Sequence, residues 1–310
     1  MSSSATPHHP FVLADLTRLG LTRSRLRAMV ADGAVRRVLR GVYAPASLPD
    51  TPETRARCAA LVLPPHCVVS DLAAAWIWGI NGYDPEALDI APALDVVSIG
   101  GPDRTRRPEL VGGKRTLRDD DLVDLAGLRI TSPLRTACDV ACLRGRHRAL
   151  AVLDGFCRRF ELELADFHGL LPRYRGRRGC RQLRELVQLA DARAESPGES
   201  WTRLDIHDAG LPPPHPQLRV TVPGWGAARL DLAYEHLRIA VEYDGQQFHG
   251  DRQRARDHAR RTALRRAGWV VIVVTKDDLS AVRCEEWLGE LREALGERTP
   301  PRRRRYSRTA

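Results

Sequence analysis

Three carboxylates stand in two segments of the chain whose other residues are typical of buried β-strands. Asp231 lies in the first segment, and Glu242 and Asp244 lie in the second. The apolar residues of the second segment have the opposite parity and are Ile239, Val241 and Tyr243. Alternation of side chains along a strand therefore places Glu242 and Asp244 on one face. If the chain reverses near residues 235–237, Asp231 lies opposite or diagonal to Glu242.

Clustered carboxylates repel one another and lose hydration when they are buried, and a divalent cation is the usual remedy. Hard oxygen ligands at this density suit Mg²⁺ or Mn²⁺ better than zinc. The chemistry that such a site most often serves is phosphodiester hydrolysis. We therefore expect Mg²⁺, or Mn²⁺ in its place, as the cofactor of these segments.

Polar residues at characteristic spacings surround the three acids. Glu199 and Arg203 stand four residues apart at the start of an expected helix, and Arg229 precedes Asp231 by two positions. His249 follows the second segment, and the pattern continues with Asp257, Arg261, Gly268 and Trp269. With these motifs the C-terminal part of the chain resembles the PD-(D/E)XK nuclease superfamily, in the branch of the very-short-patch-repair endonucleases.

This resemblance implies a role for each matching residue. Asp231 and Glu242 would be metal ligands, Glu199 a third ligand or its orienting group, and His249 a general acid or base. The expected catalytic residues are Asp231, Glu242, Asp244 and His249, supported by Arg203, Arg229, Asp257 and Arg261. The superfamily places a Lys where this chain has Asp244. The missing positive charge then comes from His249, Arg261 or Lys276, or the domain binds DNA without cutting it.

Residues 8–47 show a pattern that is typical of a small DNA-binding domain. Leucines recur at helical spacing before Gly20, and Thr22 has the position of the N-cap of a second helix. A short hairpin then bends near Gly41. Two short helices, a glycine turn and a basic hairpin compose a winged helix-turn-helix. The arginines expected to contact DNA are Arg23, Arg25 and Arg27 on the second helix and Arg36, Arg37 and Arg40 on the wing. The alternative is a helical subdomain whose charges are only solvated.

The end of this hairpin reads Arg40-Gly41-Val42-Tyr43-Ala44. It resembles the end of the N-terminal domain of AbiEi-type antitoxins. Residues 130–136 and Asp139 resemble the segment that commonly follows that domain. Arg135 and Asp139 stand four residues apart and are expected to form an ordinary ion pair on a helix face. The resemblance implies a type IV antitoxin-like protein, for which a toxin or antitoxin partner would exist.

The expected fold class is α/β, α+β overall, with four parts. A winged helix-turn-helix spans residues 8–47, a mixed α/β connecting region spans 48–190, a restriction-endonuclease-like mixed sheet flanked by helices spans 191–297, and a basic disordered tail spans 298–310. In the connecting region the patterns predict helices over 54–63, 70–78 and 133–143, a strand over 94–99 and a loop over 102–118. Trp76 and Trp78 are expected in the core of this region.

Composition narrows the class of protein. The 310 residues are 43% hydrophobic and 28% charged, which is ordinary for a globular protein. No apolar run approaches the roughly 20 residues of a membrane helix and the N-terminus is polar, so we expect a cytoplasmic protein without membrane contact. The seven scattered cysteines favour buried free thiols over a zinc site. The net charge of +10 points to a polyanionic partner, although an arginine-rich composition can arise from genomic base composition alone.

Two functions from different classes follow. The first is a metal-dependent DNA endonuclease that the winged helix docks on DNA. The alternative is a DNA-binding transcriptional regulator or type IV antitoxin-like protein whose nuclease fold is inactive. Asp244 at the Lys position favours the alternative, whereas the joint presence of Glu199, Asp231, Glu242 and His249 favours the enzyme. A partner protein of a toxin–antitoxin pair remains a third option.

Overall fold

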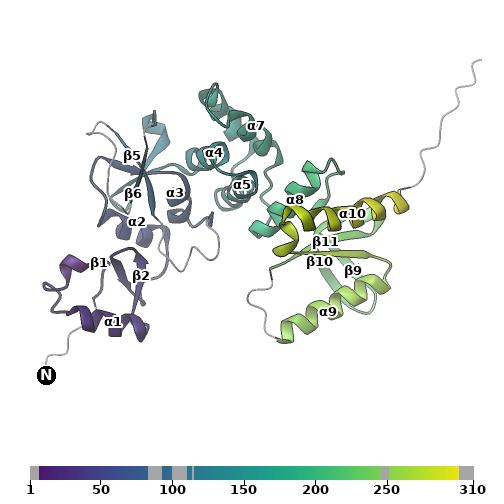
Figure 1. The fold of residues 1–310 in the computed structure, drawn as a ribbon, viewed down its shortest axis with the longest axis horizontal. Coiled ribbons are helices and arrows are strands. Elements are labelled where there is room, and N and C mark those ends of the chain that lie inside the picture. Colours follow the sequence, from purple (N-terminus) through teal and green to yellow (C-terminus); the bar gives the residue numbers. More distant parts are fainter. Residues whose placement is uncertain (1–6, 83–92, 100–109, 114, 246–250, 300–310) are drawn as a thin grey trace, which may run out of the picture. The chain divides into compact units, whose positions relative to one another are not determined.

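The computed structural model describes residues 7–82, 93–99, 110–113, 115–245 and 251–299. The chain divides into two compact units, residues 1–190 and 191–310. The first unit contains two separate sheets, and the second contains one sheet covered by helices (Figure 1). The expected mixture of helices and strands, α/β within an α+β whole, is therefore confirmed.

The N-terminal module, residues 7–47, packs one helix on a small sheet. It contains strand β1 (Phe11–Val12), the 3-10 turn η1 (Leu13–Asp15), helix α1 (Arg23–Ala31), β2 (Val35–Leu39) and β3 (Val42–Pro45). The strands are antiparallel in the order β1-β3-β2. The expected N-cap is confirmed, because the Thr22 side chain accepts a hydrogen bond from the Arg25 N–H at 3.1 Å. The expected first helix is wrong in extent: a 3-10 turn and irregular turns occupy its place.

The middle region of the first unit has a five-stranded sheet in the order β6-β5-β4-β8-β7. Its strands are β4 (Cys67–Val69), β5 (Leu94–Ser98), β6 (Leu110–Gly113), β7 (Leu122–Leu125) and β8 (Leu128–Thr131). Its α-helices are α2 (Pro52–Ala60), α3 (Asp71–Ile77), α4 (Pro133–Leu143), α5 (Arg146–Phe160), α6 (Leu164–Leu170) and α7 (Cys180–Leu189), and short 3-10 turns are η3 (Asp119–Asp121) and η4 (Leu171–Tyr174). Helix α4 has the bounds that the sequence predicts, because Ser132 caps it and Pro133 suits its first turn.

Two expectations for the middle region have different outcomes. Trp76 and Trp78 are buried, as expected for core residues. The expected loop over 102–118 is wrong in part, because β6 pairs in parallel with β5 at residues 110–113. Residues 100–109 and 114 lie outside the described residues. A four-residue strand that ends in two glycines gives too short an apolar pattern to stand out in the sequence.

The C-terminal unit is a mixed four-stranded sheet in the order β12-β11-β10-β9. Its elements are α8 (Pro197–Asp208), β9 (His215–Val222), β10 (Gly226–Tyr234), η5 (Glu235–Leu237), β11 (Ile239–Asp244), α9 (Asp251–Arg266), β12 (Val270–Thr275), η6 (Asp277–Leu279) and α10 (Ala281–Arg298). Strands β9, β10 and β11 are antiparallel neighbours, and β12 pairs in parallel with β11. The expected mixed sheet flanked by helices is confirmed.

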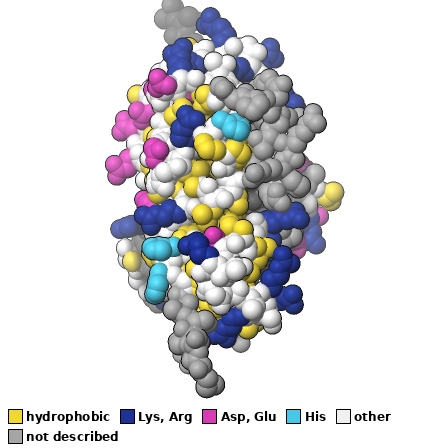
Figure 2. All heavy atoms as spheres, turned by 90° about the vertical axis from the view of Figure 1, so that its left-hand side faces the viewer, with side chains coloured by type: hydrophobic (Ala, Val, Ile, Leu, Met, Phe, Trp, Pro, Cys, Tyr) yellow, Lys and Arg dark blue, Asp and Glu magenta, His cyan; other side chains and the backbone are white. Residues whose placement is uncertain are grey.

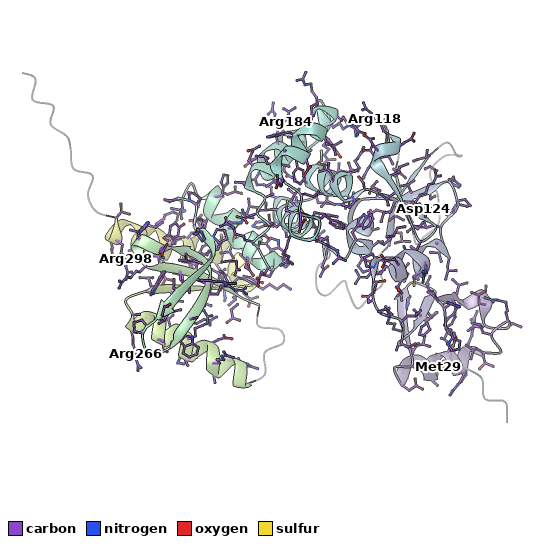
Figure 3. All side chains as sticks on the ribbon, turned by 180° about the vertical axis from the view of Figure 1, so that it is seen from behind. Met29, Arg118, Asp124, Arg184, Arg266 and Arg298 are labelled. Carbon is purple, nitrogen blue, oxygen red and sulfur yellow. The ribbon has the colours of Figure 1, made fainter. Side chains whose placement is uncertain are left out.

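Each face of this sheet has its own hydrophobic core. Ile206 of α8 and Leu291 of α10 pack on the face that carries Ile239 and Val241. Leu264 of α9 packs on the opposite face, as Figure 1 shows for the three helices. At the end of α10, Arg298 donates hydrogen bonds to three backbone carbonyls, those of Leu237, Arg238 and Gly268 (Figure 3). This arginine ties the last helix to one end of the sheet.

The cysteines match the expectation of free thiols, most of them buried. All seven cysteines are free, and five of them are buried; Cys180 and Cys284 are only partly buried. Burial raises the pKa of Cys58 and of Cys284 to about 11, which keeps both as neutral thiols. Among the described residues, every helix is too short or too polar to cross a bilayer.

Candidate functional site

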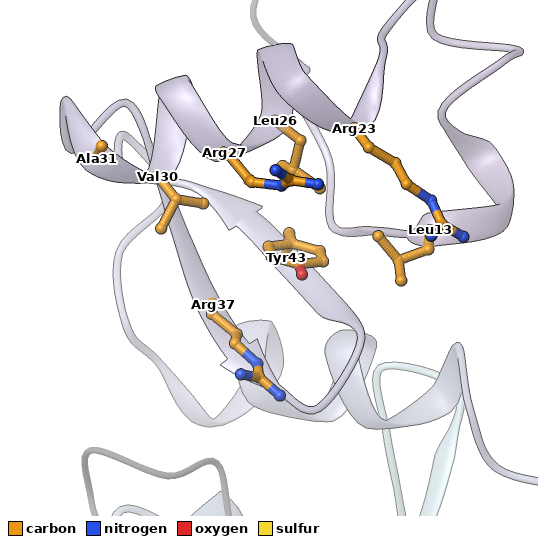
Figure 4. Close-up of a pocket in the computed structure, with 8 residues that line it drawn as sticks. All are labelled: Leu13, Arg23, Leu26, Arg27, Val30, Ala31, Arg37 and Tyr43. Carbon is orange, nitrogen blue, oxygen red and sulfur yellow. The ribbon is translucent and has the colours of Figure 1, made fainter.

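Helix α1 and the β2–β3 hairpin together form a pocket of about 460 Å³, here called the basic pocket. Its lining residues are Leu13, Arg23, Leu26, Arg27, Val30, Ala31, Arg37 and Tyr43. Arg23 and Arg27 are one helical turn apart and share a face of α1. Arg37 pairs across the hairpin with Tyr43, which brings a third guanidinium to the same pocket. Figure 4 shows the arginines around the Tyr43 ring.

The predicted DNA-contacting arginines divide into two groups. Arg23, Arg27 and Arg37 are exposed and lack a carboxylate partner among the described residues. Arg36 points to the other face of β2, donates to the Leu48 carbonyl at 3.2 Å and lies 3.6 Å from Asp50. Arg25 and Arg40, also exposed, do not line the pocket. Three of the six predicted arginines therefore converge.

The floor of the basic pocket is apolar. Leu13 and Val30 are exposed hydrophobic side chains at its two sides, and Leu26 is buried beneath. Tyr43 stacks on Phe11 with ring centroids 5.8 Å apart, which fixes the ring. Figure 2 shows Lys and Arg side chains beside hydrophobic surface in the lower half of its view. Cations around an apolar floor suit a polyanion that also presents sugar or base surface.

The middle region contains a buried ion-pair network. Arg135 is 1% exposed and its guanidinium contacts Asp139 at 3.1 Å and Asp121 at 2.8 Å. Tyr174 donates to Asp139 at 2.7 Å, and Arg115 contacts Asp139 at 2.7 Å. The expected pair of Arg135 with Asp139 is confirmed, but it is a core pair and not an ordinary pair on an exposed helix face. The spacing of four residues shows that the two side chains meet and does not show what covers them.

The network continues to the neighbouring helix and strand. Arg144 donates to Asp71 at 2.8 Å and to Asp95 at 3.1 Å, which links α3, α4 and β5. Burial and the charge of Asp71 raise the pKa of Asp95 to about 6. The described acids of the network are all engaged with arginines, so the arrangement is suited to holding the region together.

In the C-terminal unit the predicted alternation of β11 is confirmed. Glu242 and Asp244 lie on the face covered by α9, and Ile239 and Val241 lie on the other. The chain reverses at η5, and the register pairs Leu232 with Val241, so Asp231 lies beside Glu242. The Tyr243 N–H donates to Asp231 Oδ2 at 3.1 Å. The three acids come together as the sequence predicts.

Glu242 does not face open solvent. It is 2% exposed, and both of its oxygens accept hydrogen bonds from Arg260, at 2.5 and 2.9 Å. Arg261 donates to Glu242 Oε2 at 3.2 Å and to Asp244 at 2.9 Å. Arg261 was among the predicted supporting residues, but Arg260 was not. The signal that could have found it is the pair of consecutive arginines in the helix that follows the acidic strand.

Glu199 has a local structural role. The Ser196 side chain caps α8 by accepting from the Glu199 N–H at 3.2 Å, and its hydroxyl donates to Glu199 Oε1 at 2.9 Å. The other carboxylate oxygen accepts from the Glu195 N–H and from Gln217 at 2.9 and 2.8 Å. Gly198 allows this helix start to lie against the sheet, because a side chain there would overlap the Tyr243 ring.

Asp231 has the most unusual environment of the three. Burial, followed by the charges of Glu199 and Glu242, raises its pKa to about 7. The carboxyl is therefore about half protonated near neutral pH. The remaining predicted residues are more remote: Arg229 pairs with Glu195 at 2.6 Å, and Asp257 lies 3.9 Å from Arg260. Arg203 lies on α8 with Glu199, and His249 lies outside the described residues.

The donor set does not fit a divalent metal in this arrangement. A metal needs ionised carboxylates with free oxygens. Both oxygens of Glu242 are bound by Arg260, and both oxygens of Glu199 are used at the helix start. Glu242 and Glu199 therefore already have hydrogen-bond partners where a metal would need their oxygens.

Comparison with known proteins adds a family. Residues 66–191 match the model of the AbiEi antitoxin C-terminal domain. This match covers most of the middle region, which the sequence patterns alone presented as a connecting region. Two assignments stay predictions: a winged helix-turn-helix over residues 8–47 and a nuclease fold over residues 191–297.

One relative covers most of the chain. It is an uncharacterized protein of Mycobacterium tuberculosis, Rv2248 in strain H37Rv and MT2308 in strain CDC 1551. It is 33% identical to this chain over 262 residues, which are 84% of this chain and 92% of the mycobacterial protein. The chain therefore belongs to the family of this mycobacterial protein, with a region similar to the AbiEi antitoxin C-terminal domain at residues 66–191.

Proposed function

We propose that this protein is an antitoxin-like regulator that binds DNA through the basic pocket of its N-terminal module. The observation that carries the proposal is the convergence of Arg23, Arg27 and Arg37, which are exposed and unpaired among the described residues. The similarity of residues 66–191 to an antitoxin domain supports the regulatory class.

Physical chemistry favours nucleic acid as the ligand of these arginines. A guanidinium without an internal partner is free to form charge-assisted hydrogen bonds with a phosphate. Three of them on one surface, in a chain of net charge +10, attract a polyanion and release its counterions. Helix α1 presents Arg23 and Arg27 in its first turns, and the hairpin presents Arg37 beside them. This geometry suits a helix and wing that together follow a DNA backbone.

The antitoxin similarity also supports a toxin partner for the middle region. A protein of this class would act by contact with that partner or by repressing its synthesis. Binding of DNA by the N-terminal module serves the second of these routes directly. We therefore propose regulation, and not hydrolysis of DNA, as the function of this protein. The metal-dependent endonuclease stays a prediction, and the arginines bound to Glu242 do not favour it.

The test is equilibrium binding of fluorescent duplex DNA to the full-length protein, followed by anisotropy. The variant R23Q/R27Q/R37Q removes the three unpaired guanidinium groups. Each charged hydrogen bond contributes roughly tenfold in affinity, so we expect the triple variant to bind about 1,000-fold more weakly.

The matched control is R25Q, on the same helix but about 200° around its axis from Arg23. R25Q should bind DNA within about threefold of the parent, because Arg25 is an exposed charge that does not line the basic pocket. Equal affinity of parent and triple variant would remove the basic pocket from the DNA interface. Added Mg²⁺ and gel analysis of the same samples would report any cleavage.

A further inference from the structure

Glu242 and Asp244 in the C-terminal unit are paired with arginines of the same unit. Glu242 is nearly fully buried on the α9 face of the sheet. A buried carboxylate needs a compensating charge and hydrogen bonds to both oxygens. Two adjacent arginines of α9 supply them: Arg260 and Arg261, whose side chains are 20% and 18% exposed.

The geometry of these contacts is that of a fork. Arg260 donates from both terminal nitrogens, one to each oxygen of Glu242, at 2.5 and 2.9 Å. Arg261 bridges the strand, with its Nε on Glu242 and a terminal nitrogen on Asp244, at 3.2 and 2.9 Å. Planar guanidinium groups bind carboxylates in this way more specifically than lysines do. Breaking the fork would leave a buried, unpaired charge.

We propose that Arg260 and Arg261 are built-in cations that take the place of a divalent metal at Glu242. A metal could bind Glu242 only after displacing Arg260, and it would then meet the positive charge of the displaced side chain at close range. The C-terminal unit is therefore complete without a metal, and the acids clamp α9 onto the sheet. The inference rests on the contacts of Glu242 and is independent of DNA binding by the N-terminal module.

The test measures binding of Mn²⁺ to the full-length protein by isothermal titration calorimetry, with thermal unfolding of the same samples. The parent protein should show no saturable Mn²⁺ binding that depends on Glu242, and its unfolding midpoint should be equal in EDTA and in millimolar Mn²⁺. The variant R260Q frees Glu242 Oε1 and leaves Oε2 with Arg261 as its one arginine partner among the described residues. It should unfold at a lower temperature and regain part of the loss when Mn²⁺ is added.

Three further variants, E242Q/R260Q, R256Q and E242Q, keep the result decisive. E242Q/R260Q replaces the ion pair by neutral side chains of similar size, and it should fold without any response to Mn²⁺. R256Q, an exposed arginine on the same helix, should behave as the parent. The proposal is overturned if the parent binds Mn²⁺ stoichiometrically and E242Q abolishes that binding. It is also overturned if R260Q unfolds at the parent's temperature, because Arg260 would then not be the cation that Glu242 needs.

Discussion

Arginines have opposite surroundings in the N-terminal module and in the C-terminal unit. Arg23, Arg27 and Arg37 surround an open pocket and lack carboxylate partners among the described residues. Arg260 and Arg261 point at acids of the sheet and are held by four hydrogen bonds. The N–H groups of the first set are available to a ligand, whereas those of the second set already donate to carboxylates inside the fold.

This difference shows why net charge predicts function poorly. The charge of +10 sums both sets of arginines, although only the unpaired set can attract phosphate. The middle region adds a third case, because Arg135 is fully buried between two aspartates. What decides the role of an arginine is whether the fold provides an acid within reach.

The largest expected effect comes from Arg260→Met, which leaves Glu242 buried without its principal partner. We expect the opening free energy of the β10–β11 region to fall by about 3 kcal/mol, since breaking a buried pair typically costs this much. Hydrogen–deuterium exchange of peptides from this region measures it. Arg27→Met in the N-terminal module should change its local protection by less than about 0.5 kcal/mol. Similar losses for both variants would erase the contrast between the two regions.

The next effect concerns pH. The pKa of Asp231 is raised to about 7 in the folded protein, whereas a free carboxyl titrates near 4. Between about pH 4 and 7 the folded state holds a proton that the unfolded state has lost, so stability falls as pH rises. Relative to Asp231→Asn, the parent should lose stability across this window in exchange measurements on β10, and the loss should level off above about pH 7.

The pKa of Asp15 in the N-terminal module is shifted in the opposite direction to that of Asp231. The Val12 N–H and then Arg18 lower its pKa, so its contribution to stability is present at neutral pH and lost as pH falls. Protection of β1 should therefore weaken in acid and not in base. If both regions responded to pH with the same sign, the assignment of a protonated Asp231 would be wrong.

A smaller effect is expected from Thr22→Ala, which removes the cap of α1. Loss of an N-cap costs about 1 kcal/mol, and it should appear in exchange of α1 peptides. Affinity for DNA should fall by less than in the arginine variants, because the guanidinium groups remain. Thr17→Ala, at an exposed neighbouring position, is the control and should leave both measurements unchanged.

The sequence predicted local features well. Alternation placed Glu242 and Asp244 on one face, because a strand has a fixed period of two. Thr22 was recognised as a cap, because capping depends on residues three positions apart. The mixed sheet and its helices in the C-terminal unit followed from the same local patterns.

Features that depend on partners distant in the sequence were missed. Arg260 looks like any charged residue of a helix until α9 is packed on β11. Arg36 and Arg37 are consecutive residues whose side chains point to opposite faces of β2. Only the folded chain brings Asp50 close to Arg36. The short strand β1 and the burial of Arg135 likewise depend on tertiary contacts, which outweigh local propensity.

The salt dependence of duplex DNA binding tests the central claim most directly. Each phosphate neutralised by an arginine contributes about 0.9 to the slope of log affinity against log salt concentration. If Arg23, Arg27 and Arg37 bind phosphates, the slope for R23Q/R27Q/R37Q should be shallower than that of the parent by about 3. R260M, which removes a paired arginine, should keep the parent's slope. The account is contradicted if the triple variant keeps the full slope, or if R260M reduces it as much.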